Sequence, residues 1–148
     1  MVKKSLETAT ADLVQAIGLL VRRVRAAGGV QEVSWSQTSV MKRIAASGPA
    51  TIADLARAES VKPQSLGTTV AALEDMDFVA RKPHPTDGRQ MMIELTPKGA
   101  AELKRTVDAK RAWLLQAISE LDANDQQTLF AAEPIIRRLA DRRNHAPD

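Results

Sequence analysis

Three uncharged polar side chains share one face of a helix that is predicted to begin at Pro63. They are Gln64, Ser65 and Thr68, at spacings i, i+1 and i+4. The apolar side chains of the same segment fall on the opposite face and are Leu66, Val70 and Leu73. A Gln amide can form two hydrogen bonds with adenine, and a Thr methyl group can contact the methyl group of thymine. This face therefore suits the reading of base edges in DNA, although a solvated helix face shows the same pattern.

A hairpin is predicted farther along the chain, where the hydrophobic period changes from helical to two. Residues 79–82 and 91–95 have the alternation that is typical of strands. The segment between them includes Asp87-Gly88, and Asp-Gly is a strong signal for a hairpin turn. Pro83 and Pro85 stiffen this tip. We therefore expect two antiparallel strands that are joined by a stiff, polar turn.

Helical periodicity and capping residues predict the remaining elements. Helices are expected over residues 5–27, 51–58 and 63–77, and three more begin at Ser34, Thr96 and Asp122. The short helix 51–58, a tight turn over residues 59–62 and the helix that begins at Pro63 form a helix-turn-helix. The second helix of such a unit offers its N-terminal side chains to the major groove, and the hairpin that follows is the wing.

Composition excludes several classes of function. The chain has 148 residues, of which 44% are hydrophobic but 3% aromatic, so its core must be aliphatic. The absence of cysteine excludes disulfides, thiolate zinc sites and thiol-based redox sensing. Two histidines are too few for an ordinary zinc or nickel site, and neither a catalytic triad nor a glycine-rich phosphate loop is found. We therefore expect no enzyme, no metal and no cofactor.

Charge and hydropathy bear on the partners of the chain. The net charge of +3 and the isoelectric point of about 9.5 are mildly basic, which alone is weak support for a nucleic-acid partner. No run approaches the roughly 20 apolar residues that a membrane span needs. The apolar stretch at residues 17–21 is too short for a signal peptide and is closed by Arg22 and Arg23. We therefore expect a soluble cytoplasmic protein without a membrane partner.

The wing segment carries a more specific resemblance. The sequence Asp87-Gly88-Arg89-Gln90-Met91-Met92-Ile93-Glu94-Leu95-Thr96 resembles the D-x-R-x(5)-L-T signature of the MarR family of transcriptional regulators. The helix-turn-helix over residues 52–74 is similar to that family as well. The detailed likeness covers residues 34–99, and the flanking helices match in layout alone.

This resemblance implies a mainly α fold with a small β-hairpin wing: a winged helix-turn-helix with N- and C-terminal dimerisation helices. The expected divisions are an N-terminal helix at 1–33, a DNA-binding lobe at 34–96 and C-terminal helices at 97–148. The family binds double-stranded DNA at a near-palindromic operator as a homodimer. The resemblance also implies that the DNA-binding residues of the wing are Asp87, Gly88 and Arg89. Arg89 would reach the minor groove, and Asp87 would orient its guanidinium. The alternative is that Arg89 is an exposed charge that pairs with Asp87 alone.

The predicted recognition helix departs from the family pattern at three positions. Its candidate DNA-contacting residues are Lys62, Pro63, Gln64, Ser65, Gly67, Thr68 and Thr69. Lys62 stands where many members have Ser or Thr and cannot accept a capping hydrogen bond, which weakens the helix start by roughly 1 kcal/mol. Thr68 stands where members often have Arg, so one guanine reader is missing. Gly67 costs about 1 kcal/mol relative to Ala, and either permits close approach to DNA or has no function.

Basic residues in or beside the lobe are candidates for phosphate contacts. They are Arg43, Arg57, Arg81 and Lys82, in addition to Lys62 and Arg89. Ordinary surface charge is the alternative for each of them. A second basic cluster near the C-terminus is interpreted as solvated helix surface and consists of Arg137, Arg138, Arg142 and Arg143.

The resemblance also implies a small aromatic effector, because many members release DNA when such a compound binds between the dimer region and the DNA lobe. The candidate lining residues are Trp35, Met41 and Trp113, with Arg22 or Arg23 available to a carboxylate. Core packing or plain surface exposure is the alternative for each of these residues. The sequence does not identify the ligand, the operator or the regulated genes, nor does it distinguish a repressor from an activator.

Two other functions fit the same fold. A winged-helix module that binds protein would present an exposed apolar patch in place of Gln64, Ser65 and Thr68. An architectural DNA-binding protein would lack operator preference, and competition with unrelated DNA would distinguish it from a regulator.

Overall fold

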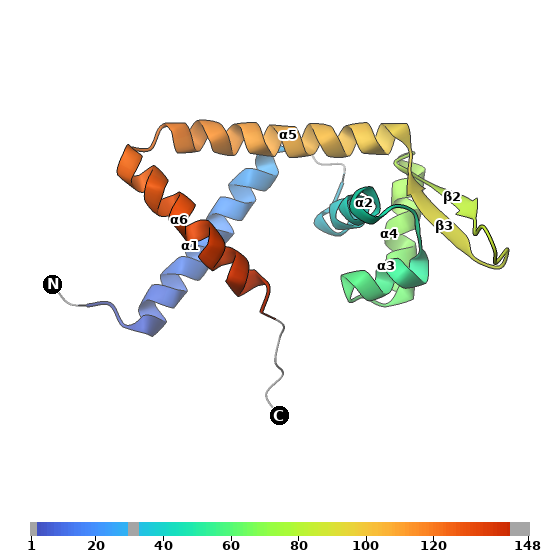
Figure 1. Cartoon of the computed structure of the whole chain (residues 1–148), viewed down its shortest axis with the longest axis horizontal. Helices are drawn as coiled ribbons and strands as arrows, with labels where there is room; N and C mark the ends of the chain where they lie inside the picture. Colours follow the sequence, from blue (N-terminus) through green and yellow to red (C-terminus); the bar gives the residue numbers. More distant parts are fainter. Residues whose placement is uncertain (1–2, 30–32, 143–148) are drawn as a thin grey trace, which may run out of the picture. The chain divides into compact units, whose positions relative to one another are not determined.

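Helices dominate the computed structural model, which describes residues 3–29 and 33–142. Within these residues the elements follow in the order α1 (Leu6–Ala27), α2 (Trp35–Ser47), β1 (Ala50–Thr51), α3 (Ile52–Glu59), α4 (Pro63–Asp75), β2 (Val79–Pro83), β3 (Met91–Leu95), α5 (Pro97–Ser119) and α6 (Ala123–Ala140) (Figure 1). The chain forms two compact units, Met1–Lys110 and Arg111–Asp148. The predicted winged helix-turn-helix is confirmed, and it lies within the first unit.

The predicted helix starts are confirmed by their capping hydrogen bonds. The Ser34 hydroxyl accepts from the Gln37 N–H at 3.2 Å, and the Gln37 side chain accepts from the Ser34 N–H at 2.8 Å, which completes a capping box. The Thr51 hydroxyl caps α3 by accepting from the N–H of Asp54. These bonds satisfy backbone donors that the first turn of a helix leaves without partners.

The small sheet has one strand more than the sequence predicts. Its order is β1-β3-β2 and both pairings are antiparallel, with Val79 opposite Leu95, Pro83 opposite Met91 and Ala50 opposite Ile93. Strand β1 escapes sequence analysis because two residues are too few to show an alternating pattern. It ties the start of α3 to the middle of β3. Pro83 at the end of edge strand β2 has no N–H to offer to another strand.

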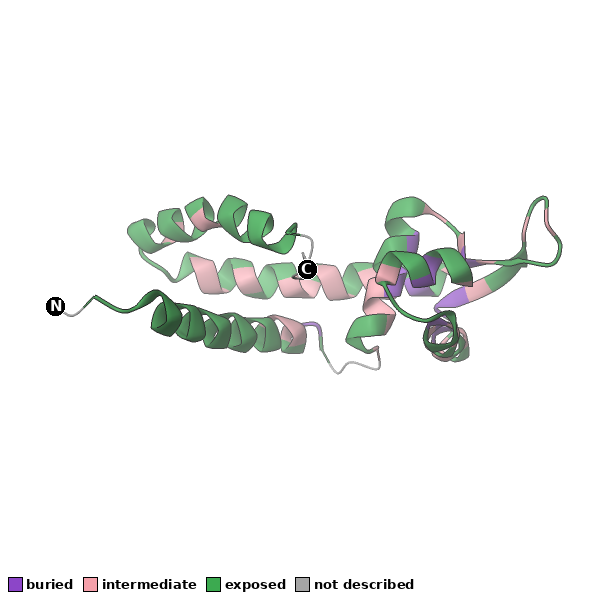
Figure 2. Cartoon of the chain, turned by 90° about the horizontal axis from the view of Figure 1, so that it is seen from below, coloured by how far each residue is buried: buried purple, intermediate pink, exposed green. Residues whose placement is uncertain are grey.

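A single aliphatic core holds the lobe together. Its buried side chains come from α2, α3, α4, the turn before β2, and strands β2 and β3. They are Val40, Met41, Ile44, Leu55, Ala56, Leu66, Val70, Leu73, Phe78, Val79 and Ile93. Figure 2 shows these buried residues gathered in the lobe, whereas α1 and α6 are almost entirely exposed. The core therefore packs α4 against the strands of the hairpin.

The start of α5 is docked tightly onto the turn before β2. Thr96 donates its hydroxyl proton to the carbonyl of Asp77 at 2.5 Å, and its oxygen accepts from the N–H of Gly99 at 3.0 Å. A Cβ atom on Gly99 would lie 2.0 Å from the carbonyl oxygen of Phe78. No side chain larger than hydrogen fits at this position without movement of the backbone.

Arg105 joins α5 to the end of α1. Arg105 donates to the carbonyl of Gly28 at 3.1 Å and forms an ion pair with Glu102 at 2.7 Å. The hydrogen bond from Arg105 is the main reason that the pKa of Glu102 lies below its ordinary value. The cation lies at the C-terminal end of α1, where the helix dipole favours positive charge.

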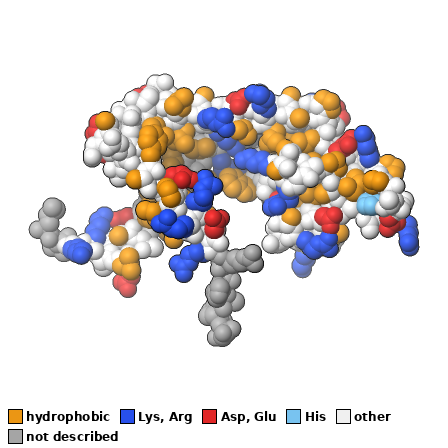
Figure 3. Space-filling model, viewed as in Figure 1, with side chains coloured by type: hydrophobic (Ala, Val, Ile, Leu, Met, Phe, Trp, Pro, Cys, Tyr) orange, Lys and Arg blue, Asp and Glu red, His pale blue; other side chains and the backbone are white. Residues whose placement is uncertain are grey.

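Large apolar side chains of the second unit are exposed to solvent. Asp122 caps α6 by accepting from the N–H of Asp125 at 2.8 Å, as predicted. The exposed large apolar residues of α6 are Leu129, Phe130, Ile135, Ile136 and Leu139. Figure 3 shows hydrophobic side chains, in orange, open on the surface in view among the blue of Lys and Arg. Among the described residues, no helix combines the length and the apolar character that crossing a bilayer requires.

The contact at Gly99 makes a first prediction. We expect Gly99→Ala to lower the free energy of unfolding by about 1–3 kcal/mol, because the new methyl group overpacks against the Phe78 carbonyl. Gly67→Ala is the matched control, since Gly67 is also helical and a Cβ there would meet nothing within 4 Å. That control should gain up to about 1 kcal/mol. Urea denaturation at equal protein concentration measures both variants, and equal stabilities would contradict the docking of α5.

Candidate nucleic-acid interface

The turn between α3 and α4 sets the direction of α4 relative to α3. Ser60 adopts the left-handed conformation with φ of 56°, and the N–H of Val61 donates back to the carbonyl of Ala56 at 3.0 Å. The turn covers residues 60–62, so the predicted turn is one residue too long and Glu59 belongs to α3. Pro63 occupies the first turn of α4, where its missing N–H leaves no bond unmade.

The predicted recognition face of α4 is exposed. Gln64, Ser65 and Thr68 are open to solvent, while the three apolar residues on the other side of the helix are buried. Thr68 donates its hydroxyl proton to the carbonyl of Gln64 at 3.2 Å. Its methyl group and its oxygen lone pairs therefore remain available to a partner. Thr69 makes the same kind of bond to Ser65 and is half-buried.

The structure describes the surroundings of Lys62 and Gly67, two positions of the recognition helix that differ from the family pattern. Lys62 occupies the N-cap position without a side-chain capping bond, as predicted. Its side chain is exposed, and it forms no ion pair with another described residue. Gly67 has open space where a side chain would be, so packing within the chain gives no reason for glycine there.

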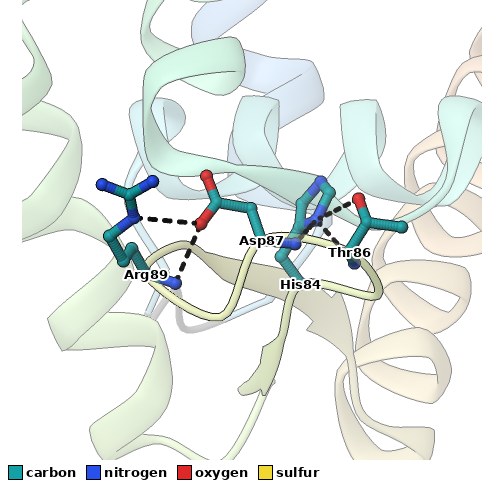
Figure 4. A network of polar contacts seen from close by, with 4 residues as sticks. All are labelled: His84, Thr86, Asp87 and Arg89. Atoms are coloured by element: carbon teal, nitrogen blue, oxygen red, sulfur yellow. Dashed lines mark hydrogen bonds and ion pairs between the residues drawn. The ribbon is translucent and has the colours of Figure 1, made fainter.

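The wing places one cation far from the core. Asp87 accepts from the N–H of Arg89 at 3.1 Å, and the same carboxylate oxygen lies 3.5 Å from Nε of Arg89 (Figure 4). The Arg89 side chain is 94% exposed. Gly88 stands between the two residues with open space around it. Asp87 thus shapes the turn and holds the base of the Arg89 guanidinium, whose other nitrogens face solvent.

The other candidate phosphate contacts are all engaged by carboxylates. The pairs are Arg43 with Glu59, Arg57 with Asp54, Arg81 with Glu74 and Lys82 with Glu94. Glu59 is the most buried of these carboxylates, at 16% exposed, and it also accepts from the Ser39 hydroxyl at 2.8 Å. Arg43 therefore ties α2 to the end of α3, which gives it a structural role in the free protein.

A small pocket lies between α1, α2 and α5 in the first unit. It has a volume of about 90 Å³ and is lined by Arg25, Trp35, Thr38, Ser39, Lys42 and Lys110. The Arg25 guanidinium lies 5.1 Å from the centre of the Trp35 ring. Burial lowers the pKa of Lys110, and the positive charges of Lys42 and Arg25 lower it further. The pocket thus combines an aromatic wall with three neighbouring cations.

The residues proposed from the sequence to line an effector pocket lie in different parts of the structure. Trp35 lies in its wall, but Met41 is 2% exposed and belongs to the core, because its position on α2 faces α3 and α4. Trp113 belongs to the second unit and is not among the residues that line this pocket. Arg22 and Arg23 are exposed and do not line this pocket, and the cations that do line it escaped sequence analysis because they come from three separate helices.

Other kinds of site find little support in the described residues. No group of three His, Asp or Glu side chains there could hold a metal ion. In the C-terminal basic cluster, Arg137 pairs with Glu133, and Arg143 lies outside the described residues.

Comparison with known proteins gives a consistent result. The MarR family model matches residues 33–91. An HTH-type transcriptional regulator of Mycobacterium leprae is 35% identical over 88% of this chain and 91% of its own length. An HTH-type transcriptional repressor of Mycobacterium tuberculosis is 37% identical over 51% of this chain and 54% of its own length. The crystal structure of RV1404 from Mycobacterium tuberculosis shares the fold, with a TM-score of 0.83, 21% identity, and coverage of 96% of this chain and 99% of that one.

These relatives are transcriptional regulators and not enzymes. The family match covers α2, the helix-turn-helix and β2, and it reaches the start of β3. The chain therefore belongs to the MarR family of DNA-binding transcriptional regulators.

Proposed function

We propose that this regulator is a homodimeric repressor that binds a near-palindromic operator and responds to a small aromatic anion. The observation that carries the proposal is the presence, in one lobe, of an exposed polar face on α4 and an exposed arginine on the wing. One relative is named a repressor, which supports the direction of regulation. A regulator of this kind works where the chromosome lies, so we place it in the cytoplasm. The polar face does not favour a protein-binding module, which would present an apolar patch there.

Helix α4 would supply the choice of sequence. Its N-terminal side chains are the ones that enter the major groove in a helix-turn-helix. Gln64 can bond N6 and N7 of adenine, and the Thr68 methyl group can contact thymine. Ser65 is short enough to bond either a base edge or a phosphate. Lys62, at the start of the helix, would meet a phosphate of the adjacent backbone.

The wing would supply affinity for many sequences. A guanidinium carries its charge at every physiological pH, and a narrow minor groove concentrates negative potential. Asp87 lies 3.5 Å from Nε of Arg89, and the Arg89 side chain is 94% exposed, so its remaining N–H groups are open to a partner. This arrangement would allow Arg89 to enter a groove without a large loss of side-chain freedom.

A comparison of two substitutions separates these roles. Arg89→Ala should weaken binding to operator and unrelated DNA alike. It should also make the fall of log K with log salt less steep by about 2, one phosphate equivalent from each subunit. Gln64→Ala should cost about 1–3 kcal/mol on the operator and little on unrelated DNA. Fluorescence anisotropy over a salt series measures both effects.

Arg137→Ala is the matched control, because it removes an exposed arginine outside the lobe. It should leave the salt slope unchanged. An Arg89→Ala variant that folds normally and binds operator as the parent does would contradict the role of the wing.

The apolar side chains of α1 and α6 support the homodimer. Leu13, Ile17 and Leu20 are each about half exposed and recur at helical spacing on α1. Several large apolar residues of α6 are equally open. Surfaces of this kind are characteristic of obligate interfaces, which bury roughly 2,000 Å² or more.

The dimer makes a prediction about mass and about DNA spacing. Sedimentation at low micromolar concentration should show one species of twice the chain mass, and Ile17→Asp should shift it to the monomer because the interface cannot bury an unpaired charge. Ala11→Asp, on the opposite face of α1, should leave the dimer intact. Insertion of half a helical turn between half-sites should abolish tight binding. A folded parent monomer at this concentration would overturn the proposal.

The pocket beside Trp35 is our candidate for the effector site. Its aromatic wall suits an aromatic ring, and its three cations suit a carboxylate. Burial is the main cause that lowers the pKa of Lys110, and an anion there would relieve the additional repulsion from Lys42 and Arg25. The volume of about 90 Å³ restricts the ligand to a small compound.

Benzoate is a suitable probe of this site, with benzylamine as the cation of similar shape. Benzoate should bind to the parent protein, and Lys110→Gln should weaken it by about tenfold, the value of one charge-assisted hydrogen bond. Lys104→Gln, which removes an exposed lysine from the same helix, is the matched control. Calorimetry measures the affinities. Equal binding of benzylamine, or unchanged binding in Lys110→Gln, would contradict the assignment.

A further inference from the structure

The ring of His84 holds the tip of the wing together. Its Nδ1 atom lies 3.2 Å from the backbone nitrogen of Thr86 and 3.0 Å from that of Asp87, and both N–H groups donate to it (Figure 4). The Thr86 hydroxyl lies 3.4 Å from the same atom. The ring is half-buried beneath the turn. A single nitrogen thus accepts hydrogen bonds from two successive backbone N–H groups, those of Thr86 and Asp87.

This geometry defines the protonation state of the ring. An imidazole nitrogen accepts a hydrogen bond only when it carries no proton, because its single in-plane lone pair is then free. His84 is therefore neutral in this structure, with its proton on Nε2. A second proton on Nδ1 would face two backbone N–H groups and would break both hydrogen bonds.

The contacts of the tip connect His84 to Arg89 through Asp87. The N–H of Asp87 donates to His84, and the carboxylate of Asp87 accepts from the N–H of Arg89 and lies against its guanidinium. The backbone closes the same turn, with the His84 N–H donating to Gln90 and the Gln90 N–H donating to Asp87, both at 3.0 Å. The position of Arg89 thus depends on the acceptor at His84.

We propose that His84 is a positioning residue for the DNA-contacting wing, and that protonation of its ring releases the tip and weakens DNA binding in mildly acidic solution. The inference rests on the proposed contact of Arg89 with DNA.

The wing carries charged residues near His84 in the sequence. Asp87 and Arg89 lie in the same tip, and Lys82 pairs with Glu94 at 2.8 Å farther along the strands. Simple electrostatics predicts the opposite pH effect, because a protonated histidine adds positive charge close to the phosphates of DNA. The direction of the pH effect therefore distinguishes a positioning role from plain surface charge.

Asparagine provides the decisive variant. Its Oδ1 is attached to Cγ as Nδ1 is in histidine, it accepts backbone hydrogen bonds in the same kind of turn, and it does not titrate. The probe is a duplex selected by the parent protein from random DNA, with affinity measured at pH 7.5 and pH 5.5 at constant ionic strength. The parent should lose at least about fivefold in affinity on acidification, the value of a lost hydrogen bond.

The variants should then separate cleanly. His84→Asn should keep the pH 7.5 affinity of the parent at both pH values, and His84→Ala should be weak at both. His145→Gln, which changes the other histidine of the chain, should retain the pH response of the parent. A His84→Asn variant as weak as His84→Ala, or a parent that binds more tightly at pH 5.5, would overturn the proposal.

A readout without DNA separates this proposal from the proposed function. Nitrogen chemical shifts of the His84 ring should show an unprotonated Nδ1 at pH 7.5 and the loss of its hydrogen bonds at pH 5.5. If the shifts behave in this way while Arg89→Ala leaves DNA binding unchanged, the proposed wing contact is wrong and the control of the tip stands. A ring with its proton on Nδ1 at pH 7.5 would overturn the inference itself.

Discussion

The burial of one side of α4 determines what the opposite side can do. Leu66, Val70 and Leu73 are each no more than 2% exposed, and burial of such side chains contributes about 1.5–3 kcal/mol apiece. A rotation of α4 about its axis would expose part of this set and cost several kcal/mol. The outward direction of Gln64 and Thr68 is therefore set by apolar residues that never meet DNA.

The wing is positioned by two different kinds of interaction. Its base belongs to the core, since Val79 and Ile93 are buried with the residues of α4. Its tip extends beyond the core, where the shape of residues 84–90 depends on hydrogen bonds among polar groups. Such bonds contribute about 0.5–1.5 kcal/mol each, so the tip is more easily altered than the base. The part of the lobe that carries Arg89 is thus also the part most sensitive to solution conditions.

Features set by local sequence were predictable, and those set by packing across the chain were not. The caps at Ser34, Thr51 and Asp122 were predicted correctly because each bond spans three residues. The pocket cations come from separate helices, so no spacing in the sequence brings them together. Met41 lies in the core, which is the alternative that the sequence left open, because an apolar residue on a helix can face either a ligand or a core. The role of His84 depends on backbone donors, which a sequence pattern does not reveal.

Ion pairing within the lobe limits its attraction for DNA of any sequence. Arg57, Arg81 and Lys82 each hold a carboxylate, so a phosphate must displace that partner, and a phosphate near the carboxylate is repelled by it. Exposed pairs of this kind are worth about 0–1 kcal/mol, so displacement is possible but the net gain is small. Lys62 is better placed, at the N-terminus of α4 and with no ion pair to another described residue. Arg89 contacts Asp87 through Nε at 3.5 Å, but its side chain is 94% exposed on the wing. A lobe with few available cations must take a larger share of its affinity from base contacts, and that share is the one that depends on sequence.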